Sequence, residues 1–313
     1  MVEETLMVAE IQRRAFSKKL KHDSTFWACY PHPRFPTLSI TGDECVLNCK
    51  HCGRSYLRHM LSCPSPSVLF RTCSSLAANG ARGVLLSGGY NEDGWVPLEG
   101  FIDTIADVKC ETGLFFNVHT GLAPPSLAKE LGRAGVDMVS VDLIGADETI
   151  KHVLGIQRTT RDYERTLKTL ERSIPNVVPH ICIGLHGGEV RGEFRALEMA
   201  ADIDTAALVF LVLIPTKGTA FEGFKAPAPS VVGELIAEAR IRFPEIPLTL
   251  GCMRPKAADR AEFELQAISS GIDRMEIPSA KAIEAAQHTG LRVRRLDACC
   301  AVPNEVAERW AIG

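Results

Sequence analysis

The chain alternates repeatedly between short β-branched or leucine-rich runs and longer helical segments. The short runs predict eight strands: Thr37–Thr41, Gly83–Ser87, Leu114–His119, Met138–Asp142, Val177–Ile183, Ala206–Leu213, Pro247–Gly251 and Arg274–Ile277. Between them, segments such as Ser126–Ala134 and Tyr163–Ser173 space apolar residues three and four positions apart, as amphipathic crossover helices do. This pattern predicts an α/β fold with a parallel sheet, either a TIM-type (β/α)8 barrel or a partial (β/α)6 barrel.

The domain organisation follows from the same pattern. The 313 residues contain no low-complexity linker and no marked shift in composition, which favours a single barrel domain. We expect an N-terminal extension over 1–36 and the barrel over 37–290. A C-terminal extension over 291–313 then contains a further short extended run, Leu291–Leu296, and an adjacent cysteine pair.

Charge and hydropathy exclude two classes of partner. Lys and Arg number 35 against 38 Asp and Glu, so the chain lacks the basic surplus that drives nucleic-acid binding. The N-terminal segment has no continuous apolar region, and no later stretch is apolar for the length that a membrane span requires. We therefore expect a cytoplasmic protein that binds neither nucleic acid nor membrane.

The segment TGDECVLNCKHC (41–52) follows the first predicted strand and carries three thiols, on Cys45, Cys49 and Cys52. Three sulfurs in one loop can converge on one iron–sulfur cubane, and because that cluster has four irons, one iron stays open to an outside ligand. The alternative is a structural zinc site with His51 as the fourth ligand. The position of the loop after a strand, where barrel enzymes build their active sites, favours the cluster.

This CysxxxCysxxCys motif resembles the signature of the radical S-adenosylmethionine (SAM) superfamily. The resemblance implies a 4Fe–4S cluster on Cys45, Cys49 and Cys52, SAM chelated to the open iron, and reductive cleavage of SAM to a 5′-deoxyadenosyl radical. It also implies a reduced ferredoxin or flavodoxin-type electron donor, and it places His51, the residue before the third cysteine, near the adenine.

Further candidate SAM contacts lie at the ends of the next predicted strands. Ser87, Gly88 and Gly89 resemble the glycine motif with which the family holds the methionine amino group, although Tyr90 stands where the family often has an acid. We expect Asp142 to contact the ribose and His119 to line the pocket. His186 and Glu189 follow the fifth strand on the same face. For any of these residues, a hydrogen bond to a loop is the alternative.

Eleven cysteines are an odd number spread over a long chain, which argues for metal binding rather than a disulfide framework. Cys252 follows the seventh strand, and the pair Cys299 and Cys300 follows the last extended run. These three predict a second iron–sulfur cluster, with Cys29 as an extra ligand if one is needed. The alternative is a buried pair without metal. The remaining cysteines, Cys63, Cys73, Cys110 and Cys182, are interpreted mainly as packing residues.

Over about residues 26–300 the chain resembles the archaeal-type, two-component lipoyl synthases within the biotin and lipoyl synthase-like group. The resemblance runs through the segments FPTLSITG (35–42), HTG (119–121), GLHGG (184–188), GCMRP (251–255) and the CC pair (299–300). It implies sulfur insertion into an octanoyl group on a lipoyl carrier protein or peptide, and a paralogous second subunit. The segment FWACYPHPR (26–34) departs from that type.

Two other functions are compatible with the sequence. One is a biotin-synthase-like radical SAM enzyme of cofactor biosynthesis that acts on another small molecule without inserting sulfur. The other is a non-enzymatic iron–sulfur or zinc protein that binds a partner through the barrel mouth.

Overall fold

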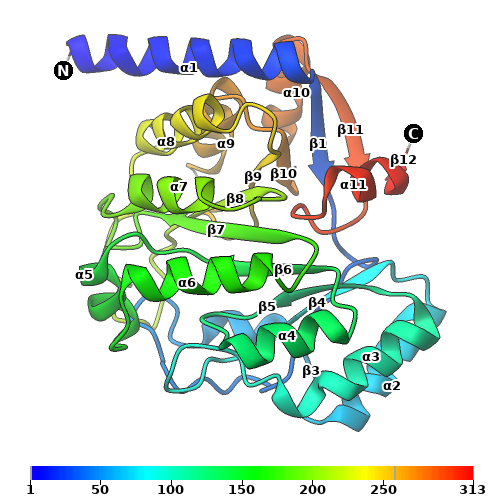
Figure 1. The fold of residues 1–313 in the computed structure, drawn as a ribbon. Coiled ribbons are helices and arrows are strands. Elements are labelled where there is room, and N and C mark those ends of the chain that lie inside the picture. The colour runs from blue at the N-terminus through cyan, green and yellow to red at the C-terminus, as the bar shows by residue number, and fades with distance from the viewer. Residues whose placement is uncertain (1, 257–258, 313) are drawn as a thin grey trace.

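The computed structural model describes residues 2–256 and 259–312. Its strands are β1 (Thr25–Cys29), β2 (Thr37–Ser39), β3 (Leu61–Ser62), β4 (Gly83–Ser87), β5 (Phe115–His119), β6 (Met138–Asp142), β7 (Val177–Ile183), β8 (Leu208–Val212), β9 (Leu248–Leu250), β10 (Arg274–Glu276), β11 (Arg292–Leu296) and β12 (Ala311–Ile312). In the described chain they form one 12-stranded sheet in the order β12-β11-β1-β10-β9-β8-β7-β6-β5-β4-β2-β3 (Figure 1). Only β12 pairs antiparallel, with β11. The sheet is curled and open.

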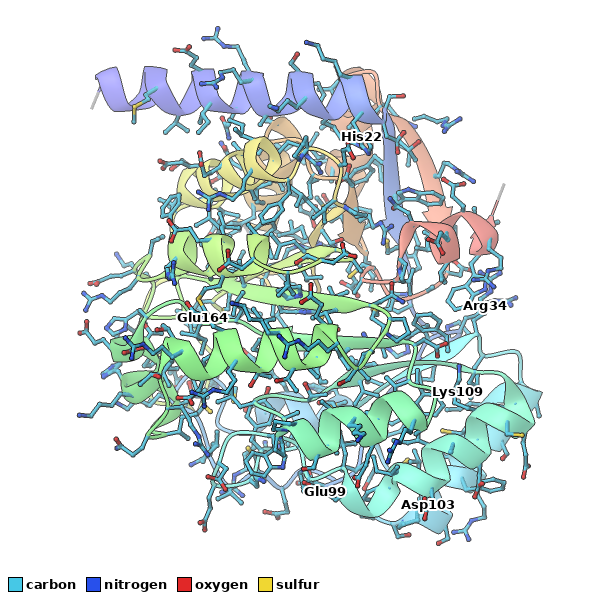
Figure 2. All side chains as sticks on the ribbon, in the orientation of Figure 1. His22, Arg34, Glu99, Asp103, Lys109 and Glu164 are labelled. Atoms are coloured by element: carbon cyan, nitrogen blue, oxygen red, sulfur yellow. The ribbon has the colours of Figure 1, made fainter. Side chains whose placement is uncertain are left out.

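Helices connect successive strands and cover the outer side of the sheet (Figure 1). They are α1 (Val2–His22), α2 (Pro66–Ala78), α3 (Ile102–Thr112), α4 (Pro125–Arg133), α5 (Asp147–Thr149), α6 (Thr160–Glu171), α7 (Glu193–Ala201), α8 (Pro229–Arg242), α9 (Arg260–Ser269), α10 (Ala280–His288) and α11 (Asn304–Trp310). Short η1 (Ser55–His59) and η2 (Glu99–Phe101) are 3-10 turns, and η3 (Ile150–Leu154) is a π-helical turn. Charged residues such as Glu99 and Asp103 lie on the exposed side of this layer (Figure 2). None of the described helices has the length and apolar character needed to cross a bilayer.

The two faces of the sheet bury different sets of residues because successive side chains of a strand point to opposite sides. On β5, Phe116 and Val118 join the large core beneath the helices. Phe115 faces the inner side and packs in a second core with Met138 of β6. Asn117 and His119 share the inner face with Phe115. The inner side therefore changes from apolar at the start of the strands to polar at their carboxyl ends.

The C-terminal tail closes the apolar end of the inner side. Ala301, Val306 and Ala307 belong to the same inner core as Phe115. The Trp310 ring stands edge-on to that of Phe115, with 5.7 Å between centroids. The polar side chains of β5 lie at the opposite end, where the strand terminates.

The predicted α/β barrel-type fold is confirmed in its open, partial form. All eight predicted strands are present, and those over Met138–Asp142 and Val177–Ile183 have the predicted bounds. The predicted extended run at the C-terminus is β11, which pairs with β1. β1 itself was not predicted, and it lies between β10 and β11 in the sheet. The chain before residue 37 therefore belongs to the sheet, and the polar N-terminal lead-in is a helix that packs on α8.

A buried charge network fastens α1 to the sheet. Lys19 is fully buried, and its Nζ lies 2.6 Å from Oδ1 of Asp273, the residue before β10. The other carboxylate oxygen of Asp273 accepts from Arg240 of α8, which is also fully buried. Although burial raises the pKa of Asp273, the charges of Arg240 and Lys19 outweigh it and lower that pKa below its usual value. One carboxylate thus compensates two buried cations.

Asp273→Asn should lower the free energy of unfolding by about 3 kcal/mol or more, because it leaves two buried cations without a counter-charge. Chemical denaturation followed by circular dichroism measures this change. Asp107→Asn, at an exposed position on α3, is the control and should change stability by less than about 0.5 kcal/mol. Equal effects of the two substitutions would contradict the proposed anchor.

Candidate active site

The cysteine loop leaves β2 and folds into tight turns. The amides of Cys52 and Gly53 both donate to the carbonyl of Cys49, at 3.2 and 2.9 Å. Asn48, Gly53 and Arg54 have positive φ values of 46°, 48° and 66°. These turns bring Sγ of Cys49, Sγ of Cys52 and a ring nitrogen of His51 within 4.8 Å of one another.

Cys45 is held at the carboxyl end of β4. The amide of Tyr90 donates to its Sγ at 3.3 Å, and the next amide, that of Val46, donates to the carbonyl of Tyr90 at 2.9 Å. Cys45 is outside the compact group of Cys49, His51 and Cys52 but close enough to raise the pKa of Cys49. The three thiols of the motif therefore gather beside the carboxyl end of β4.

The thiols interact strongly. The pKa of Cys52 is lowered to about 4. The contact with the Cys49 thiol is the main cause, burial acts in the opposite direction, and His51 adds to the lowering. The same contact, together with burial, raises the pKa of Cys49. His51 Nδ1 is buried and has no hydrogen-bond partner among the described residues. Clustered thiols beside an unpartnered imidazole nitrogen form a donor set that suits a soft metal centre.

Gly89 lets the cysteine loop lie directly on β4. A Cβ built on Gly89 would lie 2.0 Å from the carbonyl oxygen of Glu44 and 2.5 Å from Cα of Cys45. Its amide donates to Oγ1 of Thr41 at 2.7 Å. At Gly88 a Cβ would meet only side chains, at 3.1 Å or more. Gly89 is therefore required for close backbone approach, a role that the sequence-based interpretation of this motif did not include.

Ser87, the last residue of β4, is buried, and its carbonyl accepts from the amide of Ile40 at 2.9 Å. This bond joins the chain just after β2, which leads into the cysteine loop, to the end of β4, which leads into the glycine pair. The two loops therefore leave the sheet side by side.

Asp142 and His119 both lie at the carboxyl ends of their strands, β6 and β5. The Tyr90 hydroxyl donates to Oδ2 of Asp142 at 3.1 Å. Burial, and next the Asp142 charge, raise the pKa of Tyr90 well above its usual value. Tyr90 thus replaces the family's acid with a neutral donor that orients Asp142.

The sequence interpretation missed His180, which stands edge-on to His119 with 5.1 Å between ring centroids. Burial lowers the pKa of His119, and burial together with His119 lowers that of His180 to about 4. Both rings are therefore neutral at neutral pH. The signal was present in the alternation along β7, which puts Val178, His180 and Cys182 on one face.

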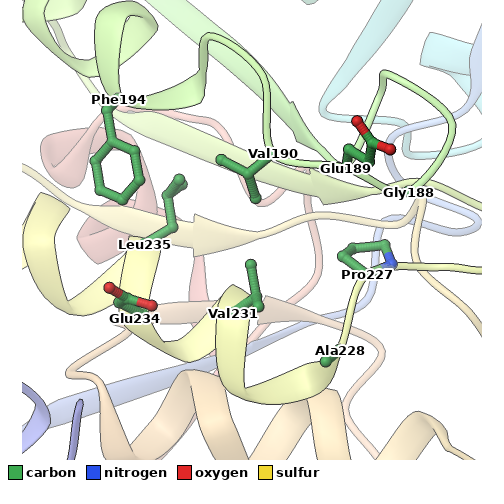
Figure 3. A pocket seen from close by; sticks show the side chains of 9 residues that line it. All are labelled: Gly188, Glu189, Val190, Phe194, Pro227, Ala228, Val231, Glu234 and Leu235. Carbon is green, nitrogen blue, oxygen red and sulfur yellow. The ribbon is translucent and has the colours of Figure 1, made fainter. Parts of the chain in front are cut away.

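His186 and Glu189 lie on the rim, in the loop after β7. His186 Nδ1 is 3.1 Å from Oγ1 of Thr149, and Glu189 pairs with Arg191 at 2.9 Å. A cavity of about 360 Å³ opens between this loop and α8, lined by Val190, Phe194, Val231 and Leu235 among others (Figure 3). Apart from Glu189 on its rim, its lining contains none of the predicted site residues, so it is separate from the cysteine loop.

The predicted second group of cysteines is brought together. Cys29 ends β1, Cys252 follows β9, and both neighbour β10 in the sheet. Burial raises the pKa of Cys29 and of Cys252, and Cys299 adds to the effect at both. The contact with Cys299, and next burial, raises the pKa of Cys300, with smaller contributions from Cys29 and Cys252. The four thiols therefore lie within electrostatic range of one another, although no three of them lie within 4.8 Å of one another as Cys49, His51 and Cys52 do. Asn117 Nδ2 lies 3.8 Å from Cys299 Sγ, so this group faces the same interior as β5.

Of the other cysteines, Cys63 and Cys73 are buried in the outer core and Cys110 is exposed on α3. Cys182 faces the inner side near Asp142, which together with burial raises the pKa of its thiol. All eleven cysteines are free.

Tyr56 connects the two groups of thiols. Burial raises its pKa to about 12, and the charges of Cys182, Cys52 and Cys252 add to that effect. Its hydroxyl is 2.9 Å from Oγ1 of Thr216. Tyr56, just after the cysteine loop, is therefore within electrostatic range of thiols of both groups.

Comparison with known proteins agrees with this geometry. The family model of the radical SAM superfamily matches residues 39–198. A biotin synthase of Halorhodospira halophila is 27% identical over 242 residues, which cover 74% of this chain and 71% of the relative. A biotin synthase of Vesicomyosocius okutanii is 26% identical over 235 residues, 71% of this chain and 70% of the relative.

Solved structures share the fold. Methylornithine synthase superposes with a TM-score of 0.64 at 15% identity, covering 86% of this chain and 77% of that one. HydG, a maturase of the FeFe-hydrogenase, gives a TM-score of 0.67 at 15% identity, covering 91% and 68%.

Proposed function

The chain belongs to the radical SAM superfamily, and from this we propose that it inserts sulfur into unactivated C–H bonds of an octanoyl group on a lipoyl carrier protein, as a component of a lipoyl synthase. The observation that carries the proposal is the gathering of Cys29, Cys252, Cys299 and Cys300 in the same interior as the cysteine triplet. A sulfur-inserting enzyme needs a sulfur source beside its radical source. A second iron–sulfur cluster on these thiols would supply it.

Cys45, Cys49 and Cys52 are the residues that would hold the first cluster. A cluster held there would pass an electron to bound SAM, and the 5′-deoxyadenosyl radical released from SAM would abstract hydrogen from the substrate. The chain contributes position and shielding: Gly89 brings the loop against β4, and the apolar floor around Phe115 closes the other end of the interior.

For SAM itself we propose contacts from His51 to the adenine and from Asp142 to the ribose. The Tyr90 hydroxyl donates a hydrogen bond to Oδ2 of Asp142. The other carboxylate oxygen is then left to accept a hydrogen bond from a ribose hydroxyl. Ser87, Gly88 and Gly89 offer backbone groups to the methionine end, and neutral His119 lines the pocket.

An octanoylated carrier protein or peptide, a ferredoxin or flavodoxin-type donor and a paralogous second subunit are the partners that this activity implies. A second candidate function within the superfamily is a biotin-synthase-like enzyme of cofactor biosynthesis that acts on another small molecule without sulfur insertion. The two candidates differ in iron content and in product.

Anaerobically reconstituted protein should bind about eight irons per chain, and a Cys252/Cys299/Cys300→Ala variant should bind about four. Incubation with SAM, reductant and an octanoylated carrier peptide, with and without the paralogous subunit, should give a product with added sulfur by mass spectrometry. About four irons in the unmodified protein, with 5′-deoxyadenosine formed and no mass change in the peptide, would favour the second candidate.

A further inference from the structure

Glu276 lies between the strands that carry two of the clustered cysteines. It is the last residue of β10, which is flanked by β1 and β9. Glu276 is in register with Cys29 of β1, so the two side chains share one face of the sheet. On the other side, Cys252 comes two residues after the end of β9. The carboxylate is thus placed among thiols.

Among the described residues, the fold supplies no hydrogen bond to Oε2 of Glu276. The residue is 6% exposed, and its Oε2 is buried without a hydrogen-bond partner in the described chain. Nη1 of Arg254 is 3.8 Å away, too far for a hydrogen bond. Arg254 is instead paired with Glu264 at 2.6 Å. A buried unpartnered carboxylate costs stability and calls for a functional explanation.

Glu264 shows what a structural carboxylate looks like in the same region. It is fully buried and accepts from Arg254 at 2.6 Å, from Arg260 at 2.8 Å and from the amide of Ser279 at 3.0 Å. Burial raises its pKa, but these hydrogen bonds outweigh that effect and lower it overall. For Glu276 burial prevails, and its pKa is raised. Of the two carboxylates, only Glu264 has its hydrogen bonds supplied by the fold.

The backbone is strained next to Glu276. Ile277 has a φ of 42°, which is unfavourable for a β-branched residue. Its amide donates to the carbonyl of Cys29 at 2.8 Å, and its carbonyl accepts from Arg254 and Arg260. These bonds hold the end of β10 against the end of β1, with Glu276 beside Cys29.

Burial does not distinguish the clustered thiols, because Cys29 is fully buried and Cys300 is 8% exposed in the same apolar inner core. Register does distinguish them: Cys29 lies opposite Glu276 on the neighbouring strand, whereas Cys300 belongs to the C-terminal tail. Its carbonyl accepts from Thr249 and Arg274, which fixes this part of the tail. Cys299, by contrast, is partly exposed toward the interior.

We propose that Glu276 is an oxygen ligand of the second iron–sulfur cluster, beside Cys29, Cys252 and Cys299, and that Cys300 is not a ligand. This inference rests on the second cluster of the proposed function. A carboxylate is a harder and weaker ligand for iron than a thiolate, so the iron that it binds is the most readily exchanged of the four.

The test uses protein in which Cys45, Cys49 and Cys52 are replaced by Ala, so that any cluster iron belongs to the second site. That background should bind about four irons per chain. Adding Glu276→Gln should remove at least one of them and change the Mössbauer and electron paramagnetic resonance spectra. Adding Glu276→Cys should restore the iron with an all-thiolate spectrum, and adding Cys300→Ala should leave iron and spectra unchanged.

The ligand assignment would be wrong if Glu276→Gln left the iron content and the spectra unchanged, or if Cys300→Ala lost the cluster. Neither result would contradict the second cluster itself. A background protein that binds no iron would overturn both the assignment and the sulfur-insertion proposal.

The apo-protein provides a second measurement that does not depend on the cluster. Glu276→Gln should keep or raise the unfolding midpoint because it removes the charge from a buried carboxylate whose Oε2 accepts no hydrogen bond from the described residues, whereas Glu264→Gln should lower it. A lowered midpoint for Glu276→Gln would show that this carboxylate serves the fold, and the proposal would fail.

Discussion

Cys49→Ala is expected to abolish formation of 5′-deoxyadenosine from SAM and to lower the iron content by about four per chain. Cys49 is 7% exposed, and its thiol contacts that of Cys52 in the tightest part of the loop. Removing it leaves two protein thiolates, too few to retain a cubane with one open iron. Anaerobic reconstitution followed by iron analysis and chromatography of the SAM products measures both effects.

Cys73→Ala is the matched control, since Cys73 is fully buried in the outer core, away from the loop. It should lose some stability and keep its iron and its cleavage of SAM. If Cys49→Ala kept its iron, or if the unmodified protein bound one zinc and no iron, the cysteine loop would be a structural metal site.

Gly89→Ala is expected to reduce SAM cleavage by about a hundredfold or more, because a displacement of reacting groups by about 1 Å has that effect. The added Cβ would lie 2.0 Å from a backbone oxygen and 2.5 Å from Cα of Cys45. Neither atom belongs to a flexible side chain, so the loop itself must move. Iron content and the rate of 5′-deoxyadenosine formation are the measurements.

Gly100→Ala tests whether loss of a glycine alone has this effect. Gly100 is exposed, and a Cβ there would meet nothing within 4 Å. Its iron content and activity should equal those of the unmodified protein. If Gly89→Ala were as active as the unmodified protein, β4 and the cysteine loop could separate without disturbing the site.

The central strands were predictable because each is a short apolar run bounded by loop residues, as in Val177–Ile183. β1 was not, because TFWAC is too short to show a period and all five of its residues are buried. The anchoring of α1 was also hidden. Lys19 resembles a surface lysine, and its partner Asp273 is far away along the chain.

At the site, the spacing of Cys45, Cys49 and Cys52 and the positions of Cys252 and Cys299 were enough to predict two groups of thiols. The spacing could not show which backbone they touch, so the contact between Gly89 and Cys45 went unrecognised. Glu276 was missed because nothing in a sequence distinguishes a carboxylate that has hydrogen bonds from one that lacks them.

The open sheet has a consequence for how the molecule behaves at high concentration. A curled sheet that does not close has two edges, and long exposed edges invite pairing with other chains. Here the edge strands are only two residues each, Leu61–Ser62 and Ala311–Ile312. β12 covers only Arg295 and Leu296 of β11, so the uncovered backbone at that edge is the segment 292–294, whose two arginines disfavour pairing with the edge strand of another molecule.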